Sequence, residues 1–290
     1  MMSFLTRLAT TFYIISLLHI PTQSLANKYD RAYKVKTIVI DAGHGGKDGT
    51  THGNFSKEKD ITLAVALKLG KAIEATMPEV KVIYTRTDDT FIELYERIAI
   101  ANRNKADLFI SLHCNSMPIT SRRIVSRYVR NKKGKRVPVY RTVRSQKTDI
   151  NGVETFVCGY GRQDEQDVAV RENASLLLEE NYKENYDGFD PNDPESYIIF
   201  SLMKSQFRDL SVRLATLVQE QYAKAGRFDR GVKEQSLAVL ARAGMPAILT
   251  EMGFISNPDE EKYMNSASGQ QEIVNNIVKA IQNYKKQVEN

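Results

Sequence analysis

Four polar residues stand where an α/β fold places its chemistry. His44, His113 and Glu251 each follow a short run of β-branched and apolar residues, and Glu58 lies at the start of a helix-like segment. Loops at the ends of strands carry the binding and catalytic groups of α/β folds. We therefore expect one shared site, built from segments that are far apart in the chain.

The types of these residues fit a metal site. Two imidazoles and one carboxylate, here His44, His113 and Glu58, are the usual ligands of a catalytic zinc ion that keeps a position open for water. Such an ion lowers the pKa of its water from about 15.7 to about 7. The spacing is not that of a compact zinc motif, and Glu58 alone also fits an ordinary carboxylate at a helix N-terminus. His52 is interpreted as a loop residue.

Glu251 is the candidate proton carrier. Hydrolysis of an amide needs a group that takes a proton from water and gives it to the leaving nitrogen. Gly253, two positions later, lets the backbone approach closely at this strand end. Burial would raise the pKa of the Glu251 carboxyl, whereas the charge of a metal ion would oppose that rise.

Strand-like and helix-like segments alternate along the chain. This alternation predicts an α/β fold, a single three-layer domain with a largely parallel or mixed sheet and helices on both faces. The predicted strands are 37–40, 80–84, 108–112, 153–158, 237–240 and 247–249, and the predicted helices are 60–76, 93–104, 163–182, 196–223 and 270–284.

The N-terminus has the pattern of a secretory signal peptide. Arg7 precedes an uncharged stretch, and Ser24 and Ala26 are small residues at the expected cleavage point. We expect a signal peptide over 1–26, cleavage near Ala26, and an exported catalytic domain over 33–287; a membrane anchor is the alternative. In an exported chain Cys114 and Cys158 could form a disulfide, or remain two buried thiols.

The basic character of the chain belongs to one segment. The formal net charge is +6, yet residues 122–147 contain eleven Lys and Arg and no Asp or Glu. Such a block is typical of a solvated, disordered loop, which is the interpretation we favour, or of an arm that binds anionic envelope polymers or an acidic activator. Nucleic acid is not expected as a partner of an exported protein.

Five ordered blocks resemble the zinc-dependent N-acetylmuramoyl-L-alanine amidases. They are 38–48 (IVIDAGHGGKD), 57–60 (KEKD), 106–116 (ADLFISLHCNS), 152–156 (GVETF) and 248–257 (ILTEMGFISN). The resemblance implies one Zn²⁺ on His44, Glu58 and His113, with Glu251 as general acid and base. It also implies a twisted mixed sheet flanked by helices, and cleavage of the amide between N-acetylmuramic acid and L-alanine of peptidoglycan. Cys114 stands where many members of the family have a small residue.

A predicted helix and a breaker-rich segment, 163–194, are inserted between the second histidine and Glu251. In division-associated periplasmic amidases of this family, a helix inserted here can cover the zinc site until a protein activator moves it. This chain resembles that arrangement in position. Glu172, Glu179 and Glu180 are the candidates for a carboxylate that blocks the metal, and a surface helix beside the cleft is the alternative.

Two other classes of function remain open at this point. One is a different exported zinc hydrolase, a peptidase or a deacetylase, since it would share the metal chemistry. The other is a non-catalytic wall-binding protein, against which the four intact residues argue. For the amidase interpretation we expect a monomer without a membrane span after cleavage, with peptidoglycan as substrate and a role in cell-wall remodelling or daughter-cell separation.

Overall fold

The computed structural model describes residues 33–49, 51–159, 165–186, 188–190 and 207–290. The predicted signal peptide, 1–26, lies outside the described residues, as do parts of the predicted helices 163–182 and 196–223. The segment Lys34–Asn290 forms one compact unit. Within the described part of the chain, no helix is long and apolar enough to cross a membrane.

A six-stranded sheet organises this unit, with the strand order β2-β1-β3-β8-β6-β7. All neighbouring strands are parallel except β6 and β8, which are antiparallel. The predicted mixed, largely parallel sheet is therefore confirmed. The strands are β1 (Thr37–Ala42), β2 (Lys81–Tyr84), β3 (Leu108–Asn115), β6 (Val153–Cys158), β7 (Asp229–Gln235) and β8 (Ala247–Phe254).

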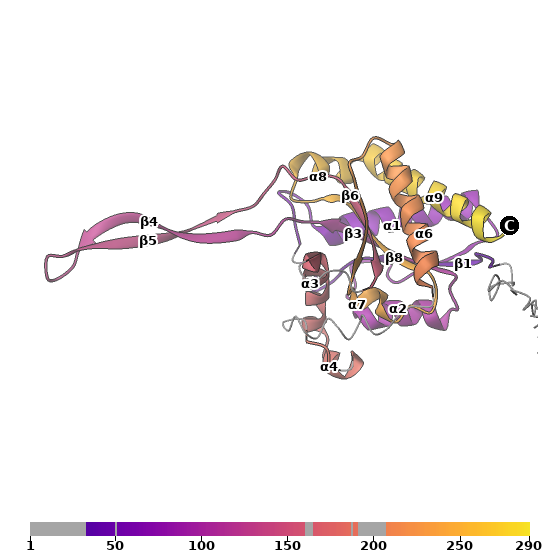
Figure 1. Ribbon diagram of the computed structural model, residues 1–290, viewed down its shortest axis with the longest axis horizontal. Coiled ribbons are helices and arrows are strands. Elements are labelled where there is room, and N and C mark those ends of the chain that lie inside the picture. The colour runs from indigo at the N-terminus through magenta and orange to yellow at the C-terminus, as the bar shows by residue number, and fades with distance from the viewer. Residues whose placement is uncertain (1–32, 50, 160–164, 187, 191–206) are drawn as a thin grey trace, which may run out of the picture. The chain divides into compact units, whose positions relative to one another are not determined.

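Helices cover both faces of the sheet, as the alternating pattern predicts (Figure 1). On one face α9 packs against both α1 and α6, and α1 contacts β1 and β3. On the other face α2 packs against a short helix, α7. The bounds are α1 (Glu58–Thr76), α2 (Leu94–Arg103), α6 (Arg208–Lys224), α7 (Ala238–Ala241), α8 (Pro258–Asn265) and α9 (Ala267–Val288).

The central strands place their side chains in two apolar layers. Every residue of β3 and β8 is buried, which is typical of parallel strands covered on both faces. On the α2 side, Val39, Phe109 and Leu249 of three neighbouring strands belong to one core cluster with Leu94 and Ile98 of the helix. This rigid core fixes the carboxyl ends of β1, β3 and β8 relative to one another.

Two predicted elements differ from the structure in the second half of the chain. The predicted strand 237–240 is wrong, because this apolar run forms the buried turn of α7. The sixth strand is instead β7, whose sequence DRGVKEQ has little apolar character. Since β7 lies at the edge of the sheet and only its last residue is buried, it needs no apolar run.

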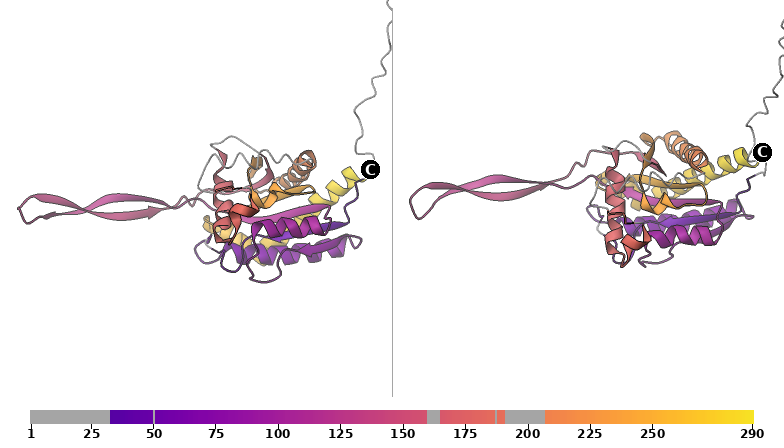
Figure 2. Two further views of the ribbon diagram at one scale, coloured as in Figure 1. Left: turned by 90° about the horizontal axis from the view of Figure 1, so that it is seen from below. Right: turned by 60° about the horizontal axis from the view of Figure 1, so that its bottom comes forward.

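The inserted helix is shorter than predicted. Its described part consists of α3 (Asp167–Asn173), a 3₁₀ turn (Ala174–Leu178) and a single turn, α4 (Tyr182–Asn185). These elements lie near the α2 side of the sheet, where Val168 and Leu176 join the core cluster. Figure 2 shows them stacked beside the carboxyl ends of the central strands.

The basic segment is ordered, so the disordered loop that we favoured is wrong. β4 (Thr120–Arg130) and β5 (Arg136–Ser145) form an antiparallel two-stranded hairpin, which extends away from the sheet (Figure 1). β-branched and aromatic residues between the arginines favour strands, and this signal was hidden by the charge. Cys114 and Cys158 are both free thiols, so the structure contains no bond between them.

Candidate metal centre and active site

The loop after β1 turns sharply and presents His44. Its backbone has φ 59°, in the left-handed region, and Gly45 and Gly46 follow with φ 127° and 55°. Few residues other than glycine adopt such a conformation, so the surrounding structure must hold it. The carbonyl oxygens of this loop are indeed bound by two buried arginines.

Arg97 of α2 and Arg86, after β2, hold the loop. Arg97 donates to the Asp41 carboxylate (Nη1–Oδ1, 2.8 Å), to the Ala42 oxygen (2.8 Å) and to the His44 oxygen (2.7 Å). Arg86 donates to the oxygens of Ala42 and Gly43, each at 2.8 Å. Sequence reasoning missed both residues. The signal available in the sequence was Arg97 itself, a charged residue on the same face of α2 as the apolar Leu94 and Ala101.

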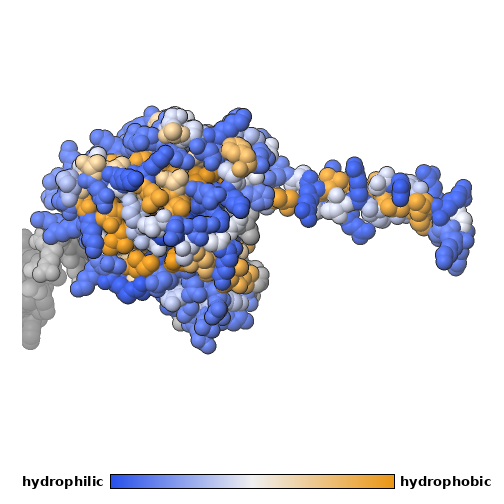
Figure 3. All heavy atoms as spheres, turned by 180° about the vertical axis from the view of Figure 1, so that it is seen from behind, coloured by the Kyte–Doolittle hydropathy of each residue, from blue (hydrophilic) through white to orange (hydrophobic). Residues whose placement is uncertain are grey.

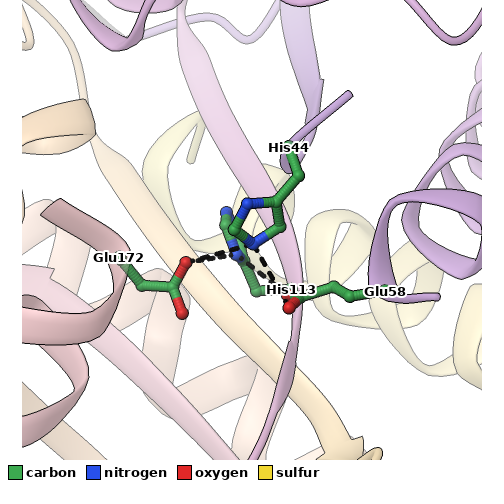
Figure 4. A group of neighbouring side chains, drawn as sticks. All are labelled: His44, Glu58, His113 and Glu172. Atoms are coloured by element: carbon green, nitrogen blue, oxygen red, sulfur yellow. Dashed lines mark hydrogen bonds and ion pairs between the residues drawn. The ribbon is translucent and has the colours of Figure 1, made fainter. Parts of the chain in front are cut away.

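Four ligand atoms, from His44, Glu58, His113 and Glu172, lie within 4.8 Å of one another. His44 Nε2 is 3.2 Å from Glu58 Oε2 and 3.3 Å from Glu172 Oε2. His113 Nδ1 is 3.1 Å from Glu58 Oε1 and 3.0 Å from Glu172 Oε2. Figure 4 shows the four side chains pointing toward one another from different elements.

Further contacts orient these side chains. His44 Nδ1 lies 2.9 Å from Asp48 Oδ2, which also accepts from Ser175 Oγ at 2.7 Å. Glu58 Oε1 accepts from the backbone N–H of Cys114 at 2.8 Å. A carboxylate on the outer nitrogen of a metal-binding histidine fixes its tautomer and ring orientation. The Asp48 contact therefore leaves Nε2 of His44 as the nitrogen available to a ligand.

The cluster fits a divalent cation. His44 Nε2, Glu58 Oε2 and Glu172 Oε2 are buried and lack a hydrogen-bond partner of acceptable geometry. Buried polar atoms without partners are costly, and a bound cation would satisfy all three. Imidazole and carboxylate ligands are those that zinc accepts. His52 is not in the cluster; its Nδ1 lies 2.9 Å from the Gly53 oxygen.

The carboxylates of the cluster are held in the ionised form. Burial would raise the pKa of Glu58, but the neighbouring charge of His44 outweighs it and lowers that pKa to about 2. The pKa of Glu172 likewise lies well below its usual range, because His113 and Arg171 outweigh burial. Burial would lower the pKa of His113, but Glu172 raises it to about 10. The ionised carboxylates thus face a positively charged imidazole, whose proton a metal ion would displace on binding.

Glu251 lies beside the cluster. It is paired with His113 in the register of β8 on β3 and is fully buried. Arg171 Nη2 donates to Glu251 Oε1 at 2.9 Å, whereas Oε2 has no hydrogen-bond partner among the described residues. Burial raises the pKa of Glu251 to about 8, although the charge of Arg171 lowers it. A carboxyl with such a pKa can both accept and release a proton near neutral pH.

Known proteins are similar to this chain in sequence and in fold. The family described as N-acetylmuramoyl-L-alanine amidase matches residues 38–283. This chain belongs to that family.

Individual relatives support this assignment. The amidase-family chain is 30% identical over 252 residues to N-acetylmuramoyl-L-alanine amidase AmiC of Escherichia coli O6:H1; the match covers 85% of this chain but 52% of AmiC, about half its length. The crystal structure of an N-acetylmuramoyl-L-alanine amidase from Clostridium difficile 630 has a TM-score of 0.56 and 25% identity, covering 87% of this chain and 97% of that one. The CwlD amidase from Clostridioides difficile in complex with the GerS lipoprotein shares the fold, with a TM-score of 0.57, 23% identity, and coverage of 87% and 99%.

Of the three glutamates that we considered as blocking residues in this amidase-family chain, Glu172 lies in the cluster and the other two do not. Glu179 accepts from the backbone N–H of Leu94 at 2.7 Å, at the start of α2. Glu180 is exposed. The sequence could not choose among them, because the choice depends on where α3 docks.

A cleft of about 790 Å³ adjoins this arrangement. One wall comes from the inserted helix, including Val170 and Arg171, and the other from the strand ends. Inside it, the Glu154 carboxylate binds Arg230 Nε (2.7 Å), Lys233 Nζ (2.8 Å) and Asn115 Nδ2 (2.9 Å). The cleft is therefore lined in part by paired charges, and none of the four cluster residues is among its lining residues.

Proposed function

We propose that this chain hydrolyses the amide bond between N-acetylmuramic acid and L-alanine in peptidoglycan, with one Zn²⁺ held by His44, Glu58 and His113. The observation that carries the proposal is the convergence of these ligand atoms next to the buried carboxyl of Glu251. Membership of the amidase family gives the bond that is cleaved.

In this mechanism the protein residues divide the work. Bound to the three ligands, Zn²⁺ supplies Lewis acidity and makes a water molecule acidic. Glu251 takes a proton at its unpartnered Oε2 and later delivers a proton to the alanine nitrogen, which then leaves as an amine. Asp48 holds the His44 ring in place, and the apolar core behind β3 and β8 excludes water from the rear of the site.

The inserted helix keeps the site closed in this proposal. Glu172 points its Oε2 at both histidines and so takes the position that substrate or water would need. The next residue, Arg171, binds Glu251 Oε1. One helix therefore occupies the open metal position and pairs with the proton carrier at the same time.

Opening requires that α3 move, which is a task for a partner. We infer a protein activator that binds the inserted segment, and the complex of CwlD with the GerS lipoprotein provides a precedent for an amidase with a protein partner. We further propose that the chain acts as an exported monomer in the cell envelope after cleavage near Ala26, in wall remodelling or daughter-cell separation.

A digestion of purified peptidoglycan tests the activity. We expect the Glu172→Ala variant with zinc to release stem peptides that begin with L-alanine, and a chelator to abolish the release. Glu172→Ala should exceed the wild-type rate at least tenfold, whereas Glu180→Ala, an exposed control, should not. Internal peptides or acetate as products would instead indicate a zinc peptidase or a deacetylase.

A second variant tests the role of Glu251. In the Glu172→Ala background, Glu251→Ala should still bind one zinc ion per chain but lose about two to four orders of magnitude in turnover, the usual contribution of a general acid or base. An active double variant would refute the assignment of Glu251. Equal rates for wild type and Glu172→Ala would refute the closed state.

A further inference from the structure

The hairpin β4–β5 is a separate surface with an unusual composition. All eleven cations of residues 122–147 are exposed. At its tip, Lys132, Lys133 and Lys135 lie within one turn. Within the described residues the two strands pair with each other and with no other strand, and a lone two-stranded hairpin is at best marginally stable in water. This surface therefore has both the charge and the energetic reason to bind a partner.

The strand register places five aliphatic residues on one face, between Arg122, Arg127 and Arg141, whereas Val125 is paired with Tyr140 on the other face. Ile124 is paired with Arg141, and Val129 with Val137, across the hairpin. A register shift between Val125 and Arg127 inserts an extra residue into β4, so residues on both sides of this bulge share the face. We call this set the aliphatic face: Ile124, Val129, Val137, Val139 and Val143. Four of them, all but Val129, are less exposed than their neighbours, as expected of side chains that pack together.

The opposite face carries two tyrosines covered by arginines. Tyr128 and Tyr140 are 52% and 48% exposed. The guanidinium of Arg136 lies 4.5 Å from the ring centre of Tyr128, and that of Arg123 lies 4.8 Å from the ring centre of Tyr140. Figure 3 shows apolar and charged side chains in alternation along the strands of the hairpin. The strands are thus both basic and apolar, whereas the tip, 130–136, has no apolar side chain.

We propose that this hairpin docks on the surface of an anionic phospholipid bilayer. Arginine and lysine side chains reach phosphate groups while their stems lie along apolar surface. The aliphatic face then lies toward the acyl chains. The inference does not depend on the hydrolytic activity of the chain.

The aliphatic face is what favours a lipid surface over other anionic partners. An anionic polymer would use the cations and leave five β-branched side chains in water. An acidic protein would need a shape complementary to the hairpin. A bilayer imposes no shape and takes up both kinds of side chain.

Sedimentation with vesicles tests the proposal, using the chain from residue 27 onward. This form keeps the compact unit Lys34–Asn290 and removes the apolar N-terminal stretch, which would bind lipid by itself. We expect binding to vesicles of phosphatidylglycerol and phosphatidylcholine, at least tenfold tighter than to phosphatidylcholine alone. Replacing the three tip lysines with serine should weaken it about 100-fold, since each cation near an anionic surface contributes about 1 kcal/mol.

Two further variants distinguish contributions to vesicle binding. One compares the hairpin with the rest of the chain, and the other compares charge with apolar burial. Lys71→Ser, Lys279→Ser and Lys286→Ser together remove the same charge from exposed sites outside the hairpin and should leave binding within about twofold. Replacing Val137, Val139 and Val143 with threonine keeps charge, shape and strand propensity. It should weaken binding roughly tenfold or more, because three methyl groups no longer leave water.

The opposite results would overturn the docking surface. Equal binding to both vesicle types, or equal loss with the control lysines, would remove the hairpin as the cause. Unchanged binding of the threonine variant would show that charge alone causes vesicle binding and that the aliphatic face does not contribute. Loss of binding to polyglutamate or to purified peptidoglycan when the tip lysines are replaced, with vesicle binding unchanged, would assign the hairpin to an acidic protein or a wall polymer.

Discussion

Replacing Arg97 with methionine should destabilise the fold and loosen the metal site together. Arg97 is fully buried, and its guanidinium binds the Asp41 carboxylate and the backbone oxygens of Ala42, His44 and Ile92 at 2.7–2.9 Å. Methionine keeps the apolar stem and removes every donor. The Asp41 charge would then remain buried with only hydroxyl partners, Ser111 and Thr85.

The size of the effect follows from the burial of this ion pair. Removing one partner of a buried pair costs about 3–5 kcal/mol, because the other charge stays desolvated. That is a large part of the roughly 5–15 kcal/mol by which a domain is stable. Removing the charge as well, in Arg97→Met with Asp41→Asn, should recover part of the loss, with a coupling energy of up to about 3 kcal/mol. Arg103→Met, on an exposed pair with Glu96, should cost at most about 1 kcal/mol.

Urea unfolding followed by far-UV circular dichroism measures these differences, since the chain has no tryptophan. Zinc affinity is measured by competition with a chromophoric chelator. Because Arg97 holds the carbonyl of His44, its loss should weaken zinc binding about 10- to 100-fold, as outer contacts of metal ligands do. A loss of stability below about 1 kcal/mol together with unchanged zinc affinity would refute this reasoning.

Three further substitutions probe other parts of the structure. Gly43→Ala should weaken zinc binding at least tenfold in chelator competition, because the added Cβ would lie 2.5 Å from His113 Nε2. Burial raises the pKa of Glu179 to about 7, so above about pH 4.5 the folded state holds a proton that the unfolded chain has released. The wild type should therefore lose stability between about pH 4.5 and pH 7, and Glu179→Gln should remove this loss. Glu261→Gln should lower the unfolding free energy by about 1–3 kcal/mol at neutral pH, because one carboxylate accepts the backbone N–H groups of residues 54, 55 and 56.

The contributions of Glu179 and Glu261 to stability change with pH in opposite directions. For Glu261, backbone hydrogen bonds outweigh burial and lower the pKa, so its contribution exists above the usual pKa and disappears as the pH falls through the lowered one. Urea unfolding of wild type and variant at several pH values checks both glutamates. A Glu179→Gln variant with the pH profile of the wild type, a Glu261→Gln variant of unchanged stability, or tight zinc binding by Gly43→Ala would each contradict the corresponding contact.

Much of the fold could be predicted because its strongest signals are local. β1, β3 and β8 each contain an uninterrupted apolar run, 38–40, 108–110 and 247–249, and α9 has one apolar face. Such patterns can be recognised without any knowledge of the neighbouring elements. β7 was missed because an edge strand needs no such run. The hairpin was misread because its β-branched residues stand between arginines, and charge alone suggested a loop.

By itself, the sequence determined the family, the mixed sheet and the positions of His44, Glu58, His113 and Glu251 at strand and helix ends. These features depend on short segments, in which the residue types alone indicate the structure without knowledge of tertiary contacts. The tertiary structure decided which glutamate of the inserted segment faces the histidines, that Arg97 holds the loop of His44, and that the basic segment is an ordered hairpin. Each of these depends on contacts between elements far apart in the chain, and only the docking of helices on the sheet brings such residues together.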